Sequence, residues 1–418
     1  MKDSGIEWIG EIPEGWEVGQ IGQLYSERRT KVSDKDYPPL SVTMKGILPQ
    51  LSTAAKTDAH DDRKLVCKGD FAINSRSDRR GSCGISEQDG SISLINTVLQ
   101  PRGEMNPGYY NWLFHTSMFA DEFYKWGHGI VDDLWTTGWS DMKKIGVPVP
   151  SKCEQKQLAE HLNFECSNID TILSKTRSSI EEYKKLKQAV ITQAVTKGVR
   201  GEREMKDSGN PWFGQIPTDW KLSRVGLHFS IILGKMLCNA PLNDTYTLEP
   251  YYCAADVHFD GVADGERKKM WFSPIEKDLY RVSVGDLLVV EGGAGAGGSA
   301  IVENQDSYTY IQNSIMIVRS KGNTDSRYLR YLLEFLVKQG YIDIVCNKAT
   351  IPHFTKDKLS CVPFCLCPTG EQKEIADYLD AKCAEIDRLI AKKEQLVKEL
   401  EGYKKSLIYE VVTGKREV

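Results

Sequence analysis

No stretch of the sequence is apolar for long enough to cross a membrane, and the first residues lack the basic and apolar segments of an export signal. A spanning helix needs about 18 consecutive apolar residues, and a secretory signal needs a basic stretch followed by an apolar one. The eleven cysteines are scattered, and an odd number without export is typical of reduced thiols. These features predict a cytoplasmic protein that does not contact membranes.

A strong excess of charge of either sign is also missing. There are 54 lysines and arginines against 58 aspartates and glutamates, which gives a formal net charge of −4. This balance neither supports nor excludes nucleic acid as a partner, because a DNA-binding protein can concentrate its cations on one face. The chain of 418 residues exceeds the usual size of a single core. We therefore expect two or more domains.

Recognisable catalytic motifs are absent as well. The Asn/Asp-Pro-Pro-Tyr/Phe tetrad of an amino-methyltransferase does not occur, and residues 37–40 resemble it only superficially. Residues 292–298 are rich in glycine, but no Gly-Lys-Ser/Thr follows them, which disfavours a phosphate-binding loop. We interpret this segment as a flexible turn after a strand, where glycine would permit close approach to DNA.

Metal ligands in a suitable spacing are lacking too. Cys361, Cys365 and Cys367 are spaced as C-x₃-C-x-C with only His353 nearby, which fits a zinc site poorly. None of the seven histidines forms an H-x-x-x-H pair. We interpret the three cysteines as buried structural thiols. The sequence thus predicts no catalytic centre, no cofactor and no metal.

What the sequence does contain is an internal repeat. Residues 1–18 and 205–222 are identical at ten of eighteen positions. Further matches recur at a nearly constant spacing along the chain, while the segments between them diverge. The chain is therefore organised as variable globule, helix, variable globule, helix. The matches are Gly69-Asp70 with Gly285-Asp286, Asn96 with Asn313, Glu154-Gln155 with Glu371-Gln372, Ile169-Asp170 with Ile386-Asp387, and Val195-Thr196 with Val412-Thr413.

Two proline-free segments, 154–196 and 371–413, predict long helices. Their apolar residues recur at heptad spacing, so each helix has a stripe that it cannot bury alone. Because a folded globule separates the helices, antiparallel pairing is the simplest arrangement. The predicted seam positions are Ile169, Ile172, Thr176, Ser179, Tyr183, Leu186 and Val190 in the first helix, and Ile386, Leu389, Lys393, Leu396, Leu400, Tyr403 and Leu407 in the second.

The intervening segments predict mixed α/β globules. Apolar, β-branched runs at 287–290 and 315–318 are typical of strands. The spacing at 109–123 and 328–338 predicts helices that start after Pro107 and Asp325, and 198–203 form a polar hinge. We expect an α+β fold with globules at 1–150 and 205–367, and with the two long antiparallel coiled-coil helices in 151–204 and 368–418.

This organisation resembles the specificity subunits of Type I restriction–modification enzymes, which have two target-recognition domains, each followed by a long helix, in a pseudo-twofold repeat. Each half here begins with Trp-x-Gly-x-Ile-Pro-x-x-Trp, at 8–16 and 212–220, similar to the family's entry pattern. The exits before Glu154 and Glu371 also resemble the family, as do the helix ends on Val-Thr. Cys365 and Cys367 stand where the first half has prolines, so we expect that turn to differ locally.

The resemblance implies that each recognition domain reads one half of a split, asymmetric site in double-stranded DNA. The helix pair would act as a ruler between the half-sites, since readable major-groove faces recur about every 34 Å. The partners implied are methyltransferase subunits, two copies docking on the helices and entry segments, and restriction–translocase subunits that join the assembly. The chain itself would be a non-catalytic subunit.

Reading bases requires polar or charged side chains at base edges, and phosphates require cations. We selected residues in segments that are typical of loops. His128 and residues 135–139 occupy the matching region of the first globule, and we interpret the aromatic residues there as core. A solvated surface stays an alternative for Arg76–Gly81 and for the run at 267–269. The candidates are Arg28, Arg29, Lys31, Lys45, Arg76, Arg79 and Arg80 in the first globule, and Lys235, Arg267, Lys268, Lys269, Lys348, Thr350 and His353 in the second.

Two other functions stay open. A stand-alone DNA-binding regulator would bind DNA tightly and specifically without a partner. A protein scaffold would use its globules to bind proteins, and changes in the basic loops would leave DNA binding unaltered. The repeated entry and helix segments favour a specificity subunit, because a pseudo-twofold surface can present equivalent sites to two copies of one partner.

Overall fold

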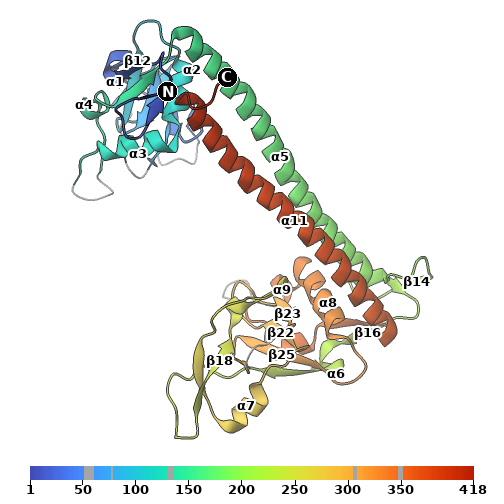
Figure 1. Cartoon of the computed structure of the whole chain (residues 1–418). Coiled ribbons are helices and arrows are strands. Elements are labelled where there is room, and N and C mark those ends of the chain that lie inside the picture. The colour runs from blue at the N-terminus through green and yellow to red at the C-terminus, as the bar shows by residue number, and fades with distance from the viewer. Residues whose placement is uncertain (51–60, 77–78, 130–134, 305–307, 347–351) are drawn as a thin grey trace. The chain divides into compact units, whose positions relative to one another are not determined.

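Two long helices organise the chain, as Figure 1 shows. Helix α5 spans Lys152–Lys197 and helix α11 spans Thr369–Val412. The computed structural model describes residues 1–50, 61–76, 79–129, 135–304, 308–346 and 352–418. At about 1.5 Å per residue the helices are roughly 69 and 66 Å long. Both predicted helical segments are confirmed.

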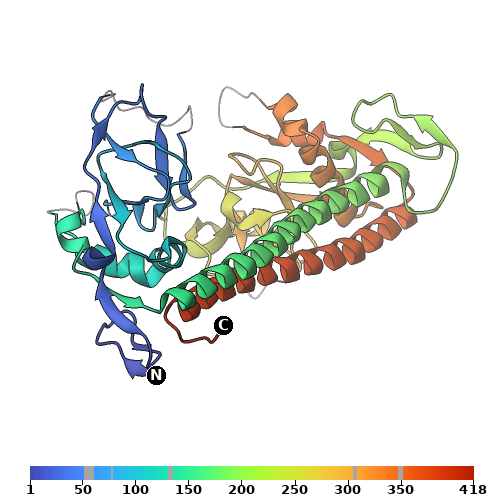
Figure 2. The same cartoon turned by 90° about the horizontal axis from the view of Figure 1, so that it is seen from above.

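Packing divides the chain into two units. Unit 1 comprises Met1–Ser178 and Glu394–Val418, and unit 2 comprises Ser179–Lys393. Each unit therefore contains one globule and a part of both long helices. Within each unit the two helices lie side by side, which can be followed in Figures 1 and 2.

The same interhelical ion pair occurs in both units. In unit 1, Lys404 donates to Asp170 at 2.6 Å. In unit 2, Lys187 donates to Asp387, with its Nζ 2.6 Å from Oδ2. The spacing of the repeat that takes Glu154 to Glu371 also takes Asp170 to Asp387 and Lys187 to Lys404. Residues that match in the sequence repeat thus make the same contact in both units.

Neighbouring contacts fix the direction of the helices. In unit 1, Arg177 lies further along α5 than Asp170, and its partner Glu401 precedes Lys404. In unit 2, the ammonium of Lys393 lies 5.7 Å from the ring centroid of Tyr183. Residue numbers in the partner helix fall as those in α5 rise. The predicted antiparallel pairing is confirmed.

Four of the fourteen predicted seam residues are exposed. Ile172 and Leu186 are 46% and 48% exposed, whereas Leu173 and Ile180, each one residue after a predicted position, are buried. The lysines of the repeated ion pairs, Lys187 and Lys404, occupy the same shifted positions and pair with an aspartate of the other helix. The exposed counterparts in α11 are Leu396 and Tyr403.

A four-stranded antiparallel sheet forms the centre of each globule. Its order is β10-β9-β12-β4 in unit 1 and β23-β22-β25-β17 in unit 2. The strands predicted at 287–290 and 315–318 are confirmed as β22 and β25. The strands are β4 (Tyr25–Glu27), β9 (Phe71–Asn74), β10 (Cys83–Ile85) and β12 (Asn96–Pro101), and then β17 (Phe229–Leu233), β22 (Leu287–Val290), β23 (Ser299–Ile301) and β25 (Ile315–Ser320).

Helices cover these sheets from positions that correspond in the two units. The helix predicted at 109–123 is two helices, because the Thr116 hydroxyl caps the second one by accepting a hydrogen bond from Phe119 N. The predicted start near Asp325 is confirmed, since its carboxylate accepts hydrogen bonds from the first turn of α8. The helices are α2 (Pro107–Phe114) and α3 (Ser117–Lys125) in unit 1, and α8 (Ser326–Lys338) and α9 (Tyr341–Val345) in unit 2.

Short strand pairs close each globule, and two kinds recur. An entry hairpin joins β1 (Lys2–Asp3) to β2 (Glu11–Ile12), and β14 (Met205–Asp207) to β15 (Gln215–Pro217). An exit pair joins β3 (Glu17–Gln20) to β13 (Gly146–Val149), and β16 (Lys221–Arg224) to β26 (Pro363–Leu366). These matches, with the sheets and helices, confirm the α+β class and the internal repeat.

The remaining elements complete the two globules. In unit 1 they are α1 (Ile21–Leu24), β5 (Lys31–Val32), β6 (Leu40–Thr43), β7 (Gly46–Pro49), β8 (Arg63–Val66), β11 (Gly90–Ile92) and α4 (Trp139–Met142). In unit 2 they are α6 (Val225–His228), β18 (Thr247–Tyr252), η3 (Ala254–Asp256), β19 (Val257–His258), β20 (Gly261–Val262), β21 (Lys269–Phe272), α7 (Pro274–Tyr280), β24 (Tyr310–Ile311) and α10 (Lys356–Ser360).

The repeated Trp and Glu residues form the joint between each globule and the long helices. The indole Nε1 of Trp16 donates to Glu154 at 3.2 Å, and that of Trp220 donates to Glu371 at 3.2 Å. Both rings are buried in cores that include residues of both long helices. Because a buried indole N–H must find an acceptor, the first turn of each helix is fixed against its globule's entry segment.

The repeated glutamines complete this joint. Gln155 donates to the Pro150 carbonyl at 2.9 Å and accepts from Asn106 N at 2.9 Å. Gln372 makes the matching bonds, to the Cys367 carbonyl at 2.8 Å and from Asp325 N at 3.0 Å. Each glutamine thus ties the exit strand to the helix that follows the sheet.

The expected local difference at the cysteine-containing exit is not found. The exit strands pair with the entry segment in the same way in both units, and the carbonyl of Cys367 serves as that of Pro150 does. Cys365 and Cys367 are buried, as predicted, and burial raises the pKa of the Cys365 thiol to about 12. A small apolar thiol replaces proline here because the contacts are made by backbone atoms.

The two joints differ in which groups donate hydrogen bonds to the glutamate carboxylate. In unit 1, the Ser151 N–H donates to Glu154 at 2.9 Å, and its hydroxyl helps to lower the pKa of that carboxyl. Pro368 occupies the matching position in unit 2 and has no N–H to donate. Arg203 instead donates to the fully buried Glu371.

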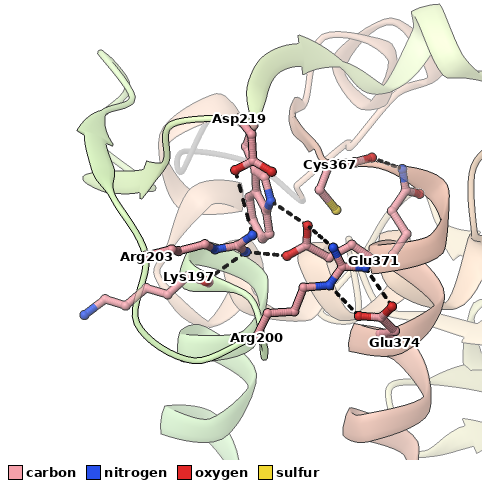
Figure 3. Close-up of polar contacts among 9 residues, drawn as sticks. Lys197, Arg200, Arg203, Asp219, Cys367, Glu371 and Glu374 are labelled. Atoms are coloured by element: carbon pink, nitrogen blue, oxygen red, sulfur yellow. Dashed lines mark hydrogen bonds and ion pairs between the residues drawn. The ribbon is translucent and has the colours of Figure 1, made fainter.

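Figure 3 shows how the connector after α5 supplies this replacement. Arg203 approaches Glu371 from residues 198–204, and its guanidinium also lies 5.2 Å from the ring centroid of Trp220. Arg200 forms a two-point contact with Glu374, at 2.6 and 2.7 Å. The segment predicted as a hinge is therefore held by ion pairs in unit 2.

We expect Trp220→Phe to destabilise the chain more than Trp16→Phe. Both substitutions remove the same indole atoms from a buried site, so their packing losses are similar. Only Trp220→Phe takes a donor from a completely buried carboxylate, which adds about 1–2 kcal/mol. Urea-induced unfolding of the two variants measures the difference, and equal losses would contradict it.

Candidate nucleic-acid interface

The site begins at the turn that leads into the central sheet of each globule. Gly69 and Gly285 adopt φ values of +88° and +89°, which glycine tolerates without strain. The buried carboxylates of Asp70 and Asp286 accept hydrogen bonds from the backbone N–H three residues earlier, at 2.9 and 2.8 Å. The repeated Gly-Asp pair is thus a turn that sets where β9 and β22 begin.

An arginine binds each of these aspartates. Arg28 contacts Asp70 at 2.6 and 3.1 Å, and Arg319 contacts Asp286 at 2.7 and 2.6 Å. Hydrogen bonding to Asp70 raises the pKa of Arg28. Arg28 was selected as a DNA contact, but the structure directs its guanidinium into the sheet, where it supports the turn.

The end of β9 forms an edge that we call exit edge 1, made of Ser75, Arg76, His128 and Thr136. Thr137 N donates to the Ser75 carbonyl at 2.9 Å, and Arg76 forms a bridge with Thr136. Thr136 also exchanges backbone hydrogen bonds with His128 at 2.9 and 3.0 Å. Residues from three parts of the sequence therefore share one edge.

The end of β22 forms the corresponding edge, exit edge 2, made of Glu291, Gly292, Pro352 and His353. Phe354 N donates to the Glu291 carbonyl at 2.6 Å, and Gly292 forms a bridge with His353. The spacing that takes Gly69 to Gly285 also takes Arg76 to Gly292. The spacing that takes Glu154 to Glu371 takes Thr136 to His353. The two edges are the same structural feature in the two units.

Exit edge 1 is firmly supported from below. The Arg80 guanidinium lies 3.7 Å from the ring centroid of Tyr124 and 2.9 Å from Asp121. The hollow beneath the edge, lined by Arg76, Arg80 and aromatic side chains including Trp135, holds only about 20 Å³, room for about one water. The aromatic residue Trp135 is therefore packing, as predicted, and the arginines are held over a closed surface.

The other basic candidates of unit 1 lie at the surface. Arg29 is exposed and pairs with Glu27 at 2.7 Å, and Lys31 is exposed and pairs with Asp62 at 2.5 Å. Lys45 lies exposed in the tight turn between β6 and β7. Arg79 follows the edge in chain order, and Ser82 N donates to its carbonyl at 3.1 Å.

In unit 2 the basic candidates divide into engaged and exposed groups. Lys235 is 9% exposed, donates to Glu276 at 2.5 Å, and lies 4.9 Å from the ring centroid of Tyr246. Arg267 pairs with Asp256 at 3.1 Å. Lys268, Lys269 and His353 are exposed, while Lys348 and Thr350 lie outside the described residues.

The glycine-rich segment 292–298 is explained by packing at its second half. Gly297 has a φ of +82°, and a Cβ there would lie 2.8 Å from Val337 Cγ2 and 2.9 Å from Ile342 Cδ1. Helices α8 and α9 therefore approach this backbone directly. The interpretation of the whole segment as a flexible turn is wrong for 296–298, which are buried.

Sequence reasoning missed three members of this site. Thr136 and Glu291 belong to the exit edges, and Lys358 donates to the His353 carbonyl at 2.7 Å. The spacing of the repeat was the signal that could have found the first two. Within the described part of the chain, no three His, Cys, Asp or Glu side chains come together as metal ligands, and no helix is long and apolar enough to span a membrane.

Two globules with a common sheet, each joined to an antiparallel helix pair, define a repeat-built class of proteins. The family model for the Type I restriction modification DNA specificity domain matches residues 218–399. Two curated relatives from Methanocaldococcus jannaschii match along nearly the whole chain. The MjaX specificity subunit of a type I restriction enzyme is 25% identical, covering 97% of this chain and 95% of its own, and the MjaVIII subunit is 24% identical, covering 97% and 93%.

Solved structures agree with the fold. One from a study of the assembly and conformational transition of the type I R-M system has a TM-score of 0.73 at 14% identity, covering 97% of this chain and all of that one. The HsdS subunit from Thermoanaerobacter tengcongensis has a TM-score of 0.57 at 16% identity, covering 97% and 98%. The chain is thus similar to Type I restriction enzyme specificity subunits along nearly its whole length, and its second half matches the DNA specificity domain, in agreement with the predicted resemblance to non-catalytic subunits.

We expect replacement of Arg76 and Arg80 by glutamine to weaken binding to duplex DNA and to flatten its salt dependence. Each lost phosphate contact lowers the slope of log K against log salt by about 0.9. Titrations at several salt concentrations measure the slope. The exposed helix residue Arg177→Gln is the matched control, and a slope equal to the control would assign the arginines to an ordinary surface.

Proposed function

We propose that this specificity subunit reads a two-part, asymmetric site in double-stranded DNA, one half-site with each globule. The observation that carries the proposal is the pair of exit edges. They occupy the same position in the same sheet but present different side chains, arginine with threonine in one and glutamate with histidine in the other. The same sheet edge with different side chains in the two units suits the reading of two different half-sites.

The proposed division of the chain follows the repeat. Residues 1–150 and 205–367 act as the two target-recognition domains, and 151–204 and 368–418 act as spacer helices. DNA contacts come from the basic candidates of the two globules, with the exposed residues Arg29, Lys31, Lys45, Lys268 and Lys269 serving phosphates. Arg28, Lys235 and Arg267 support the loops from inside, because each is held by a carboxylate and its side chain is largely buried.

The partners proposed are two methyltransferase subunits and restriction–translocase subunits, in the cytoplasm. The repeated entry hairpins and helix segments offer two equivalent surfaces, which supports two copies of one partner. A stand-alone regulator and a protein scaffold are the alternatives. The hydrogen-bonded joints favour a rigid reader over a scaffold, because they hold each sheet in a fixed relation to its helix ends.

The test is a map of methylated bases in the DNA of cells that express this chain with its methyltransferase subunit. We expect one methylated motif of two parts with an unspecified spacer, and we expect it to vanish when this chain is omitted. A stable complex of the two proteins without any motif would overturn the proposal in favour of a scaffold. Tight, specific binding of DNA by the isolated chain without methylation would favour a regulator.

The helix pair as a ruler gives a second expectation. Deleting 174–180 together with 391–397 removes one heptad from each helix, at matching positions of the repeat, and keeps both interhelical ion pairs. The helices shorten by about 10.5 Å, which corresponds to about three base pairs of duplex. The variant must first be shown to bind the methyltransferase subunit.

We expect that variant to methylate the same half-sites with a shorter spacer, or to lose methylation because the half-sites fall out of phase. The same methylation map measures it. An unchanged spacer would show that the helices do not set the distance.

A further inference from the structure

The two exit edges carry opposite charges at neighbouring positions of the repeat. The spacing of the repeat relates Ser75 to Glu291, Arg76 to Gly292 and Thr136 to His353. The first edge therefore presents a cation where the second has none, and the second presents a carboxylate where the first has a hydroxyl. All candidates chosen for charge were cations, so this acid stands out among the proposed reading groups.

Glu291 is held in place by the sheet around it. Its N–H donates to the Ser314 carbonyl at 2.8 Å, and its carbonyl accepts from Phe354 N at 2.6 Å. Its carboxylate Oε2 lies 3.5 Å from Nδ1 of His353. The glutamate side chain is 16% exposed and the imidazole is 62% exposed. The carboxylate is thus fixed just below the surface, with an exposed ring beside it.

A carboxylate at a DNA-facing edge is repelled by phosphates, and it cannot bind them. It can accept a hydrogen bond from a base amino group, and the cytosine N4 amine in the major groove is the partner that glutamate and aspartate recognise. Arg76, one position further along the other edge, suits the O6 and N7 acceptors of guanine. The repeated frame would therefore present opposite hydrogen-bonding groups to its two half-sites.

We propose that Glu291, oriented by His353, specifies a cytosine in the half-site read by unit 2. Glu291 is the contacting residue and His353 is a positioning residue that keeps the carboxylate aimed outward. This assignment rests on the proposed function, because it needs unit 2 to read DNA with exit edge 2. It adds an acidic specificity residue to a set of candidates chosen for positive charge.

The test maps methylated motifs for the full chain in complex with its methyltransferase, comparing the natural sequence with Glu291→Gln. Glutamine keeps the size of the side chain and removes its charge. We expect one G·C position of one half-site to lose discrimination by roughly 5- to 150-fold, with the other half-site unchanged. His353→Gln should relax the same position to a smaller extent.

Arg76→Gln is the control in unit 1, because it changes the charged residue of exit edge 1. We expect it to alter only the other half-site, which identifies the half-site that each unit reads. If the natural chain gives no two-part motif, the proposed function fails. If it gives a motif and Glu291→Gln lowers methylation equally at all sites, relaxes an A·T position, or changes nothing, the inference about Glu291 is overturned.

Discussion

A glutamate carboxylate held by a buried indole N–H is the interaction on which the rest of this structure depends. The glutamate belongs to the first turn of a long helix, and the tryptophan ends the entry segment of the globule. Since a buried indole N–H left unpaired costs about 1–3 kcal/mol, the bond fixes one against the other. The neighbouring glutamine adds two backbone contacts, and the sheet, its helices and its edges are then set relative to the helix ends.

On this frame the two units diverge at the edges of the central sheet. The Gly-Asp turn and its arginine keep the central sheet the same, although the arginine comes from β25 in one unit and from the residue after β4 in the other. The edges at the ends of β9 and β22 then carry unlike side chains. The contacts made by the repeated residues are the same in both units, although the sequence around them differs.

The sequence was sufficient to predict those parts of the structure that depend on local or repeated patterns. The two helices, their antiparallel pairing, the class of fold and the family followed from proline-free segments and matched motifs. Four of the fourteen seam positions were wrong, because heptad counting favours leucine over lysine, and Lys187 and Lys404 pair with aspartates on the other helix. That preference depends on a partner in a distant part of the chain.

The candidate site was harder to predict for the same reason. Arg28 and Lys235 were chosen for their charge, but Asp70 and Glu276 neutralise them from distant segments. Glu291 was not chosen at all, since an acidic residue in a strand exit gives no signal of its own. Its relation to the first half lies in the spacing of the repeat, and the bridges to Thr136 and His353 show it in space.

The unequal supply of hydrogen bonds to the two glutamates limits how freely the halves can be interchanged. At the exit of the first half, the N–H of Ser151 donates to the glutamate, so no donor from the connector is needed. A second-half exit, with Pro368, relies on Arg203, which lies outside its globule, before the entry hairpin. A second globule moved without Arg203 would leave the buried carboxylate with the indole of Trp220 and the more distant Arg200, so an exchanged segment that keeps this contact must begin inside the connector.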